Sequence, residues 1–309
     1  MPGVLQARLE VRSSTVAGSH LNTRIAERQG FPGPDPTTIC TMQTVSSADG
    51  TSIAFERHGA GPPLILLHGG SAPQYWKPIV PRFADDYTVI IPHRRGVGES
   101  GDTAEYTLDR GVEDMRAVID AVEGTPVLFG HSFGGLLALE TARTASVEKL
   151  IAYEPAVLVG EYREKADLAG QMQARIDDGD RRQAMKFYIR EVMHGGDIDD
   201  FDAWLAEWPP WPDIVALTEN VARINRAIEQ YQLPESIDLD APTLLLTGTE
   251  GPPHLKDGIR AVDDVLSDSQ LLEFDGIGHG GPTEAPDRVI SEVRAFIEGT
   301  EAPTPAGGD

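Results

Sequence analysis

Residues 127–135 read VLFGHSFGG, and the rest of the chain is best interpreted outward from this turn. An apolar run ends at Gly130, Ser132 is held between small residues, and a helix-like pattern follows. Gly-x-Ser-x-Gly after a buried strand is typical of a strand-to-helix turn so sharp that the central backbone is strained. The pattern therefore predicts that Ser132 is exposed above a sheet edge, with the backbone N–H of Phe133 beside it.

Buried-strand patterns occur on both sides of this turn. Continuous apolar runs predict strands that are covered on both faces, and TSIAFER (51–57) alternates like a half-buried strand. Strands that alternate with helical patterns predict an α/β protein with a mostly parallel central sheet flanked by helices. The predicted strands are 51–57, 63–69, 87–93, 126–130, 149–155, 242–248 and 270–274.

Residues 156–240 interrupt the alternation, because they are helical in pattern and contain no clear buried strand. An insertion this long between two strands predicts a separate layer, a helical cap inserted after the sixth strand. A peripheral helical extension without a role in binding is the alternative. Aromatic side chains of this segment are candidates either for an apolar substrate pocket or for docking the cap. They are Trp204, Trp208 and Trp211, together with Phe187 and Tyr188.

The two ends of the chain differ from its middle. We expect a poorly ordered extension over 1–41, which contains the proline-rich FPGPDPTT, and a disordered tail over 299–309. The α/β core is then 42–155 and 241–298, with the cap over 156–240. The sequence leaves open whether the protein starts at Met1 or at Met42. Neither a signal-peptide pattern nor a run of eighteen apolar residues is present, so no membrane span is predicted.

The formal net charge of −23 disfavours nucleic acid and anionic membranes as partners, because both repel such a surface. Only five of the 26 basic residues are lysines, and an acidic, lysine-poor surface resembles proteins of salt-adapted organisms. An ordinary acidic protein is the alternative. The single cysteine, Cys40, cannot form an internal disulfide, and a cytoplasmic location is expected.

Four stretches in the interval 46–299 resemble the α/β-hydrolase family, in the family's order. They are the oxyanion loop LLHGGS (66–71), the loop RRGVGES (94–100), the nucleophile elbow GHSFGG (130–135) and the loop GIGHGGP (276–282), which carries the catalytic histidine. The second loop departs from the family, since His93 stands where an aspartate usually begins it. The resemblance implies that Ser132 is the nucleophile and His279 the base, with Gly70 and Phe133 as oxyanion donors.

A serine needs a base to remove its proton, and histidine titrates near working pH, which fits His279. The acid is less well defined. The family usually places it after the strand 242–248, and Glu250 is the favoured candidate although it stands one residue before the usual position, here Gly251. Glu154, at the end of the sixth strand, is the alternative acid, because some relatives use that place; it is otherwise a structural carboxylate.

These residues predict a serine hydrolase that acts on an ester or related small acyl substrate without a cofactor. A carbon–carbon bond hydrolase or lyase with the same triad is the alternative, and a catalytically silent binding protein is the third reading. Serine at the elbow argues against epoxide or carbon–halogen opening, for which relatives use aspartate. No zinc signature, Walker loop or Gly-x-Gly-x-x-Gly motif occurs, and the oligomeric state is left open.

Overall fold

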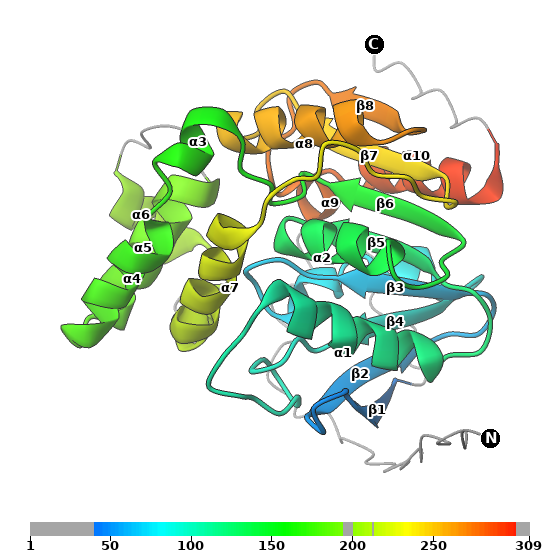
Figure 1. The fold of residues 1–309 in the computed structure, drawn as a ribbon, viewed down its shortest axis with the longest axis horizontal. Helices are drawn as coiled ribbons and strands as arrows, with labels where there is room; N and C mark the ends of the chain where they lie inside the picture. Colours follow the sequence, from blue (N-terminus) through cyan, green and yellow to red (C-terminus); the bar gives the residue numbers. More distant parts are fainter. Residues whose placement is uncertain (1–39, 194–199, 212, 301–309) are drawn as a thin grey trace.

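A computed structural model describes residues 40–193, 200–211 and 213–300. Its centre is an eight-stranded sheet with the strand order β1-β2-β4-β3-β5-β6-β7-β8 (Figure 1). Strand β2 is antiparallel to both of its neighbours, and all other neighbouring strands are parallel. The strands are β1 (Thr41–Ser46), β2 (Ser52–His58), β3 (Pro63–Leu67), β4 (Thr88–Pro92), β5 (Val127–His131), β6 (Lys149–Tyr153), β7 (Thr243–Gly248) and β8 (Gln270–Phe274).

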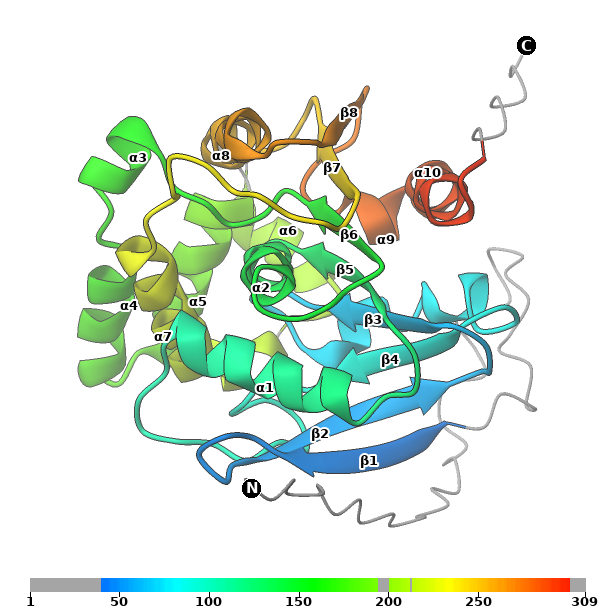
Figure 2. The ribbon, with the colours of Figure 1, turned by 45° about the vertical axis from the view of Figure 1, so that its right-hand side comes forward.

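Helices cover both faces of the sheet (Figure 2). On one face lie α1 (Leu108–Asp120), α2 (Phe133–Ala142) and α8 (Pro253–Val265). On the other face lie α10 (Pro286–Glu298) and the short helices η2 (Pro73–Trp76) and η3 (Val80–Arg82). A further short helix, α9 (Gly281–Glu284), precedes α10.

The continuous apolar runs of the sequence are explained by this two-sided cover. Successive side chains of a strand point to opposite faces, so Leu64 and Leu66 of β3 pack toward α10 while Ile65 and Leu67 pack toward α1 and α2. All five residues of β3 are buried. A strand with two buried faces has no polar positions, and this is why the central strands read as unbroken apolar runs.

The predicted fold class is confirmed, and the seven predicted strands correspond to β2–β8. Strand β1 was missed, because most of its residues are only half-buried at the sheet edge and leave no apolar run. It begins at Thr41, the last residue assigned to the predicted N-terminal extension. Residues 1–39 and 301–309, which make up most of the two segments predicted to be loosely ordered, lie outside the described residues.

The regular elements in the described part of the chain between β6 and β7 are helices, and they pack mainly against one another. Their side chains form a separate hydrophobic cluster, and α7 also contacts α1. They are α3 (Gly160–Glu164), α4 (Leu168–Asp177), α5 (Arg181–Tyr188), η4 (Ile189–Met193), α6 (Phe201–Glu207), η5 (Asp213–Leu217) and α7 (Thr218–Gln230), called here the inserted helices. Among all described helices none is long and apolar enough to cross a bilayer.

Candidate active site

Ser132 occupies the turn between β5 and α2, with a left-handed backbone at φ 57° and ψ −125°. Such a conformation costs a non-glycine residue on the order of 1–3 kcal/mol and is found where the surroundings enforce it. Here the conformation is enforced because neighbouring backbone segments pack closely against the turn. A Cβ at Gly130 would overlap the carbonyl of Gly134, and a Cβ at Gly134 would overlap the carbonyl of Leu67. The two glycines therefore permit the sharp turn that presents the serine above the sheet.

His279 follows β8, and its Nδ1 lies 2.6 Å from Oε2 of Glu154. Glu154 directly follows β6 and is fully buried. The other carboxylate oxygen accepts hydrogen bonds from Thr247 Oγ1 at 2.8 Å and from the backbone N–H of Gly248 at 3.2 Å. A buried carboxylate is stable when its oxygens accept several hydrogen bonds, and these contacts leave Nε2 as the free ring nitrogen of His279.

Glu250, the acid that the sequence analysis favoured, makes no side-chain hydrogen bond within the described part of the chain. Its backbone N–H donates to Ile277 at 3.0 Å. The carboxylate that contacts His279 is the alternative, Glu154, and a Cβ at Gly251 would overlap its Oε1. Glu154 thus reaches from β6 into the space where the family usually has an acid after β7. A left-handed backbone at φ 42° lets it do so.

The loop that carries His279 is fixed by two side chains from neighbouring strands. Tyr153 Oη donates to the carbonyl of Gly278 at 2.6 Å, and His131 Nε2 lies 2.7 Å from the carbonyl of His279. A carbonyl accepts only, so His131 carries its proton on Nε2. The ring of Tyr75 stacks on His131 with 4.6 Å between centroids. Sequence reasoning missed these contacts, since His131 occupies a variable position and no motif signals Tyr153.

Burial keeps other nearby imidazoles neutral. It lowers the pKa of His68 and of His131 well below the ordinary value, and it lowers the pKa of His254 to about 4. None of these three has a carboxylate hydrogen-bond partner among the described residues. His279 differs from them because its Nδ1 contacts the carboxylate of Glu154.

The loop after β3 lies against the serine. A Cβ at Gly69 would be 2.7 Å from the Cβ of Ser132. No acceptor within the described residues takes the backbone N–H of Gly70 or of Phe133, the two predicted oxyanion donors. Backbone N–H groups without an acceptor can stabilise a negatively charged oxygen; one of these two belongs to the loop that lies against Ser132, and the other to the residue that follows Ser132.

Arg94 holds this loop from behind. Its guanidinium, which is buried, donates to the carbonyl of Gly69 at 2.8 Å and to Asn220 Oδ1 of α7 at 3.0 Å. Gly69 C=O and Gly70 N–H belong to one planar trans peptide and point in opposite directions. A donor that fixes the carbonyl therefore also fixes the direction of the Gly70 N–H. The sequence analysis assigned Arg94 only to a family loop.

The inserted helices reach the site through Tyr188 of α5, whose hydroxyl would overlap a Cβ at Gly70. Burial raises the pKa of Tyr188 to about 12, so its hydroxyl stays protonated. The three candidate pocket tryptophans pack within the cluster of the inserted helices: Trp204 stacks on Trp208, and Arg182 lies over Trp211. Their predicted pocket role stays a prediction.

Ser132 and His279 are both nearly covered, with exposed fractions of 4% and 6%. No hydrogen bond joins their side chains, and of the two only His279 is oriented by a side-chain hydrogen bond within the described residues. Catalytic hydrogen bonds are often long before substrate binds, so this does not exclude proton transfer. The serine, the imidazole and Glu154 come from the carboxyl ends of β5, β8 and β6, three strands of one sheet region.

Residues 64–292 match the sequence profile of the alpha/beta hydrolase family, so the chain belongs to that family. A putative non-heme bromoperoxidase, BpoC, of Mycobacterium tuberculosis is 26% identical over an alignment of 271 residues that covers 81% of this chain and 99% of the relative. A pimeloyl-[acyl-carrier protein] methyl ester esterase of Aeromonas hydrophila is 27% identical over an alignment of 262 residues that covers 80% of this chain and 99% of the relative.

Among solved structures, an alpha/beta hydrolase from Sphaerobacter thermophilus is similar, with a TM-score of 0.66 and 32% identity. The match covers 75% of this chain and 91% of that one. The esterase and hydrolase relatives together support a hydrolase. The chain spans nearly the full length of these proteins.

Proposed function

We propose that the protein is a serine hydrolase that cleaves an ester or a related acyl substrate through an acyl-enzyme. Ser132 is the nucleophile, His279 the general base and Glu154 the acid of the triad. This assignment gives the third role to the alternative of the sequence analysis, because Glu154 is the carboxylate hydrogen-bonded to His279. That hydrogen bond is the observation that carries the proposal.

In the proposed reaction, Nε2 of His279 takes the hydroxyl proton while Ser132 Oγ attacks the substrate carbonyl. Glu154 holds the imidazole by Nδ1 and stabilises its charged form. The oxyanion accepts hydrogen bonds from the backbone N–H groups of Gly70 and Phe133. The tetrahedral intermediate collapses, and the proton on His279 passes to the leaving alcohol. Water, deprotonated by the same imidazole, then releases the acyl group and restores the serine.

The proposal includes the inserted helices as a cap over this site. Support comes from Tyr188, whose hydroxyl lies against Gly70, and from Asn220, which contacts Arg94. Both residues belong to the inserted helices, so the segment between β6 and β7 borders the oxyanion loop. The relative from Aeromonas hydrophila is named for a methyl ester substrate, which agrees with an ester for this chain.

A substrate panel tests the proposal. Wild-type protein and the Ser132→Ala variant are assayed on short p-nitrophenyl esters, lactones and vinylogous diketones. We expect wild type to hydrolyse at least one ester and the variant to lose about 10⁴-fold or more in kcat/KM. Equal ester turnover by the two proteins would refute the proposal. Turnover of the diketones alone would instead identify the carbon–carbon bond hydrolase of the sequence analysis.

A further inference from the structure

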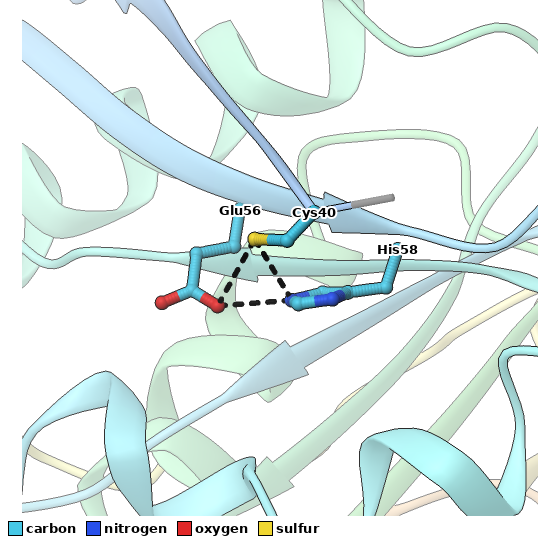
Figure 3. Close-up of side chains that lie close together, drawn as sticks. All are labelled: Cys40, Glu56 and His58. Atoms are coloured by element: carbon cyan, nitrogen blue, oxygen red, sulfur yellow. Dashed lines mark hydrogen bonds and ion pairs between the residues drawn. The ribbon is translucent and has the colours of Figure 1, made fainter. Parts of the chain in front are cut away.

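A second group of reactive side chains lies at β1 and β2, toward the opposite edge of the sheet from the strands that carry the triad. Strand β1 pairs with β2 so that Thr41 is opposite Arg57, and the same register places Cys40 opposite His58. Glu56 is two residues from His58 and therefore points to the same face of β2. Cross-strand pairing thus brings a thiol, an imidazole and a carboxylate together on one face (Figure 3).

The donor atoms of this group converge on one point. Cys40 Sγ is 3.7 Å from His58 Nε2 and 4.0 Å from Glu56 Oε2, and the last two atoms are 2.9 Å apart. Zinc bound tetrahedrally by sulfur at about 2.3 Å and by nitrogen and oxygen at about 2.0–2.1 Å has donor–donor edges of roughly 3.3–3.6 Å. The three observed distances scatter around these edges by about half an ångström or less, so small side-chain rotations bring all three atoms to bonding distance of one ion.

The contacts are those of three donor atoms around one bound cation, and not those of a proton relay. In a nucleophile–histidine–acid relay the thiol and the carboxylate contact opposite ring nitrogens. Here both face the same nitrogen, Nε2 of His58. A single proton on Nε2 cannot serve both neighbours well, whereas a cation placed among the three atoms contacts them all.

His93 supports Glu56 from the buried side. Its Nδ1 accepts the backbone N–H of Glu99 at 3.0 Å, so its proton is on Nε2, which lies 3.4 Å from Glu56 Oε1. Metal-binding carboxylates are commonly oriented by such an outer hydrogen bond. His58 and Glu56 are partly buried, and Cys40 is exposed, which leaves a path for an ion to enter.

We propose that Cys40, Glu56 and His58 form a binding site for a divalent transition-metal ion, with zinc the best fit to sulfur, oxygen and nitrogen donors. Water completes the fourth position. Binding replaces the thiol proton of Cys40, which is released to solvent, so one proton leaves for each zinc bound.

The site is separate from the proposed hydrolytic reaction. It lies on β1 and β2, while Ser132, His279 and Glu154 follow β5, β8 and β6. The ion would join the edge strand β1 to β2 and so stabilise the start of the sheet. Cys40 does not form part of a zinc motif in the sequence, because its partners are brought to it by strand pairing rather than by spacing along the chain.

Metal titration of the full chain tests the proposal. After chelator treatment and dialysis, Zn²⁺ is titrated calorimetrically and Co²⁺ spectroscopically, both with excess Mg²⁺ present. We expect one ion per chain with a Kd near or below about 1 μM, and a cobalt–thiolate charge-transfer band in the near ultraviolet. Cys40→Ser should abolish that band, and Cys40→Ser, Glu56→Gln and His58→Gln should each weaken zinc binding by about 10-fold or more.

Two control variants separate this site from general binding by an acidic surface and from the triad. Glu105→Gln removes an exposed carboxylate outside the group and should bind zinc as wild type does, as should Ser132→Ala. The proposal is overturned if wild type shows no saturable one-to-one binding. It is equally overturned if Cys40→Ser binds cobalt with an unchanged spectrum, or if Glu105→Gln loses as much affinity as Glu56→Gln.

Discussion

Glu154 contacts His279 from a position that few sequence signals indicate. It follows β6 rather than β7, and the family's usual acid position is a glycine. The glycine at the usual acid position has a steric reason, because a Cβ at Gly251 would overlap the Glu154 carboxylate. The position lacks a side chain because another residue's carboxylate already fills it.

Replacing Glu154 by glutamine should lower kcat by about 10³–10⁴-fold. An amide in place of the carboxylate either stabilises the wrong imidazole tautomer or fails to stabilise the imidazolium. Glu250→Gln, the matched control, should stay within about threefold of wild type, because Glu250 makes no side-chain hydrogen bond in the described chain. Steady-state ester hydrolysis measures both. A loss with Glu250→Gln as large as that with Glu154→Gln would show that the acid is assigned wrongly.

A rescue experiment sharpens the same assignment. In a Glu154→Ala background the space beside Gly251 is empty, so Gly251→Asp should place a new carboxylate near His279. We expect the double variant to recover at least about 10-fold in kcat over Glu154→Ala alone. Gly251→Ala in the wild-type background should instead reduce activity, since its methyl group displaces the carboxylate. Melting curves check that each variant is folded.

Residues with a local signature could be predicted, whereas residues defined by contacts across strands could not. Ser132 and His279 stand in glycine-rich loops that the sequence displays directly, and they follow β5 and β8, whose carboxyl ends lie at the same edge of the parallel sheet. The sequence favoured Glu250 as the partner of His279, whereas the carboxylate that contacts His279 is Glu154, because two glutamates one strand apart are indistinguishable until the backbone at Glu154 is known. The hydrogen bonds from Tyr153 and His131 to the loop that carries His279 depend on the same cross-strand geometry.

At the level of elements, the site consists of turns at the carboxyl ends of parallel strands. The turn after β3 and the start of α2 each offer one N–H group, and neither turn can take bulkier residues at its glycines. The buried Arg94 fixes one of them by its hydrogen bond to Gly69. The orientation of a single peptide plane thus depends on a side chain from the turn after β4.

Arg94→Met should therefore lower kcat by about 10-fold with a smaller change in KM. Loss of a complete oxyanion donor costs about 10²–10³-fold, and a misoriented donor loses only part of that. Asn220→Leu is the control, because it removes the contact of Arg94 with α7 and leaves the Gly69 contact in place. Steady-state kinetics and melting temperatures are compared. If Asn220→Leu loses kcat to the same extent, Arg94 acts only by attaching α7 to the core.

The central strands were predictable because both of their faces are buried, whereas the edge strand β1 was missed. The strands β3–β7 read as apolar runs because α1, α2 and α8 cover one face and α10 and the short helices the other. Strand β1 lies at the edge, with half-buried residues, so its existence follows from pairing with β2 rather than from its own pattern.

On the scale of the whole molecule, the net charge of −23 must be accommodated on one surface. Repulsion among these charges opposes the compact state, and salt reduces it by shortening the Debye length from about 10 Å at 0.1 M to about 3 Å at 1 M. This is the physical content of the proposed salt adaptation.

Raising KCl from 0.1 to 2 M should accordingly increase the melting temperature by about 5 °C or more, or roughly 2 kcal/mol for a domain of this size. A variant with three exposed acids neutralised, Asp120→Asn, Glu123→Gln and Asp240→Asn, should melt higher at low salt and gain less from KCl. Scanning calorimetry measures both proteins. An unchanged or falling melting temperature in salt would mean that the composition reflects something other than adaptation to salt.

The most direct test of the central claim is the site at which an active-site phosphonate attaches. Wild-type protein is treated with a fluorophosphonate, digested and mapped by mass spectrometry. The proposed mechanism predicts a single adduct on the peptide that contains Ser132, slow or absent labelling in Glu154→Gln, and labelling at the wild-type rate in Glu250→Gln. An adduct on another serine, or an unmodified Ser132 in a protein that hydrolyses esters, would contradict it.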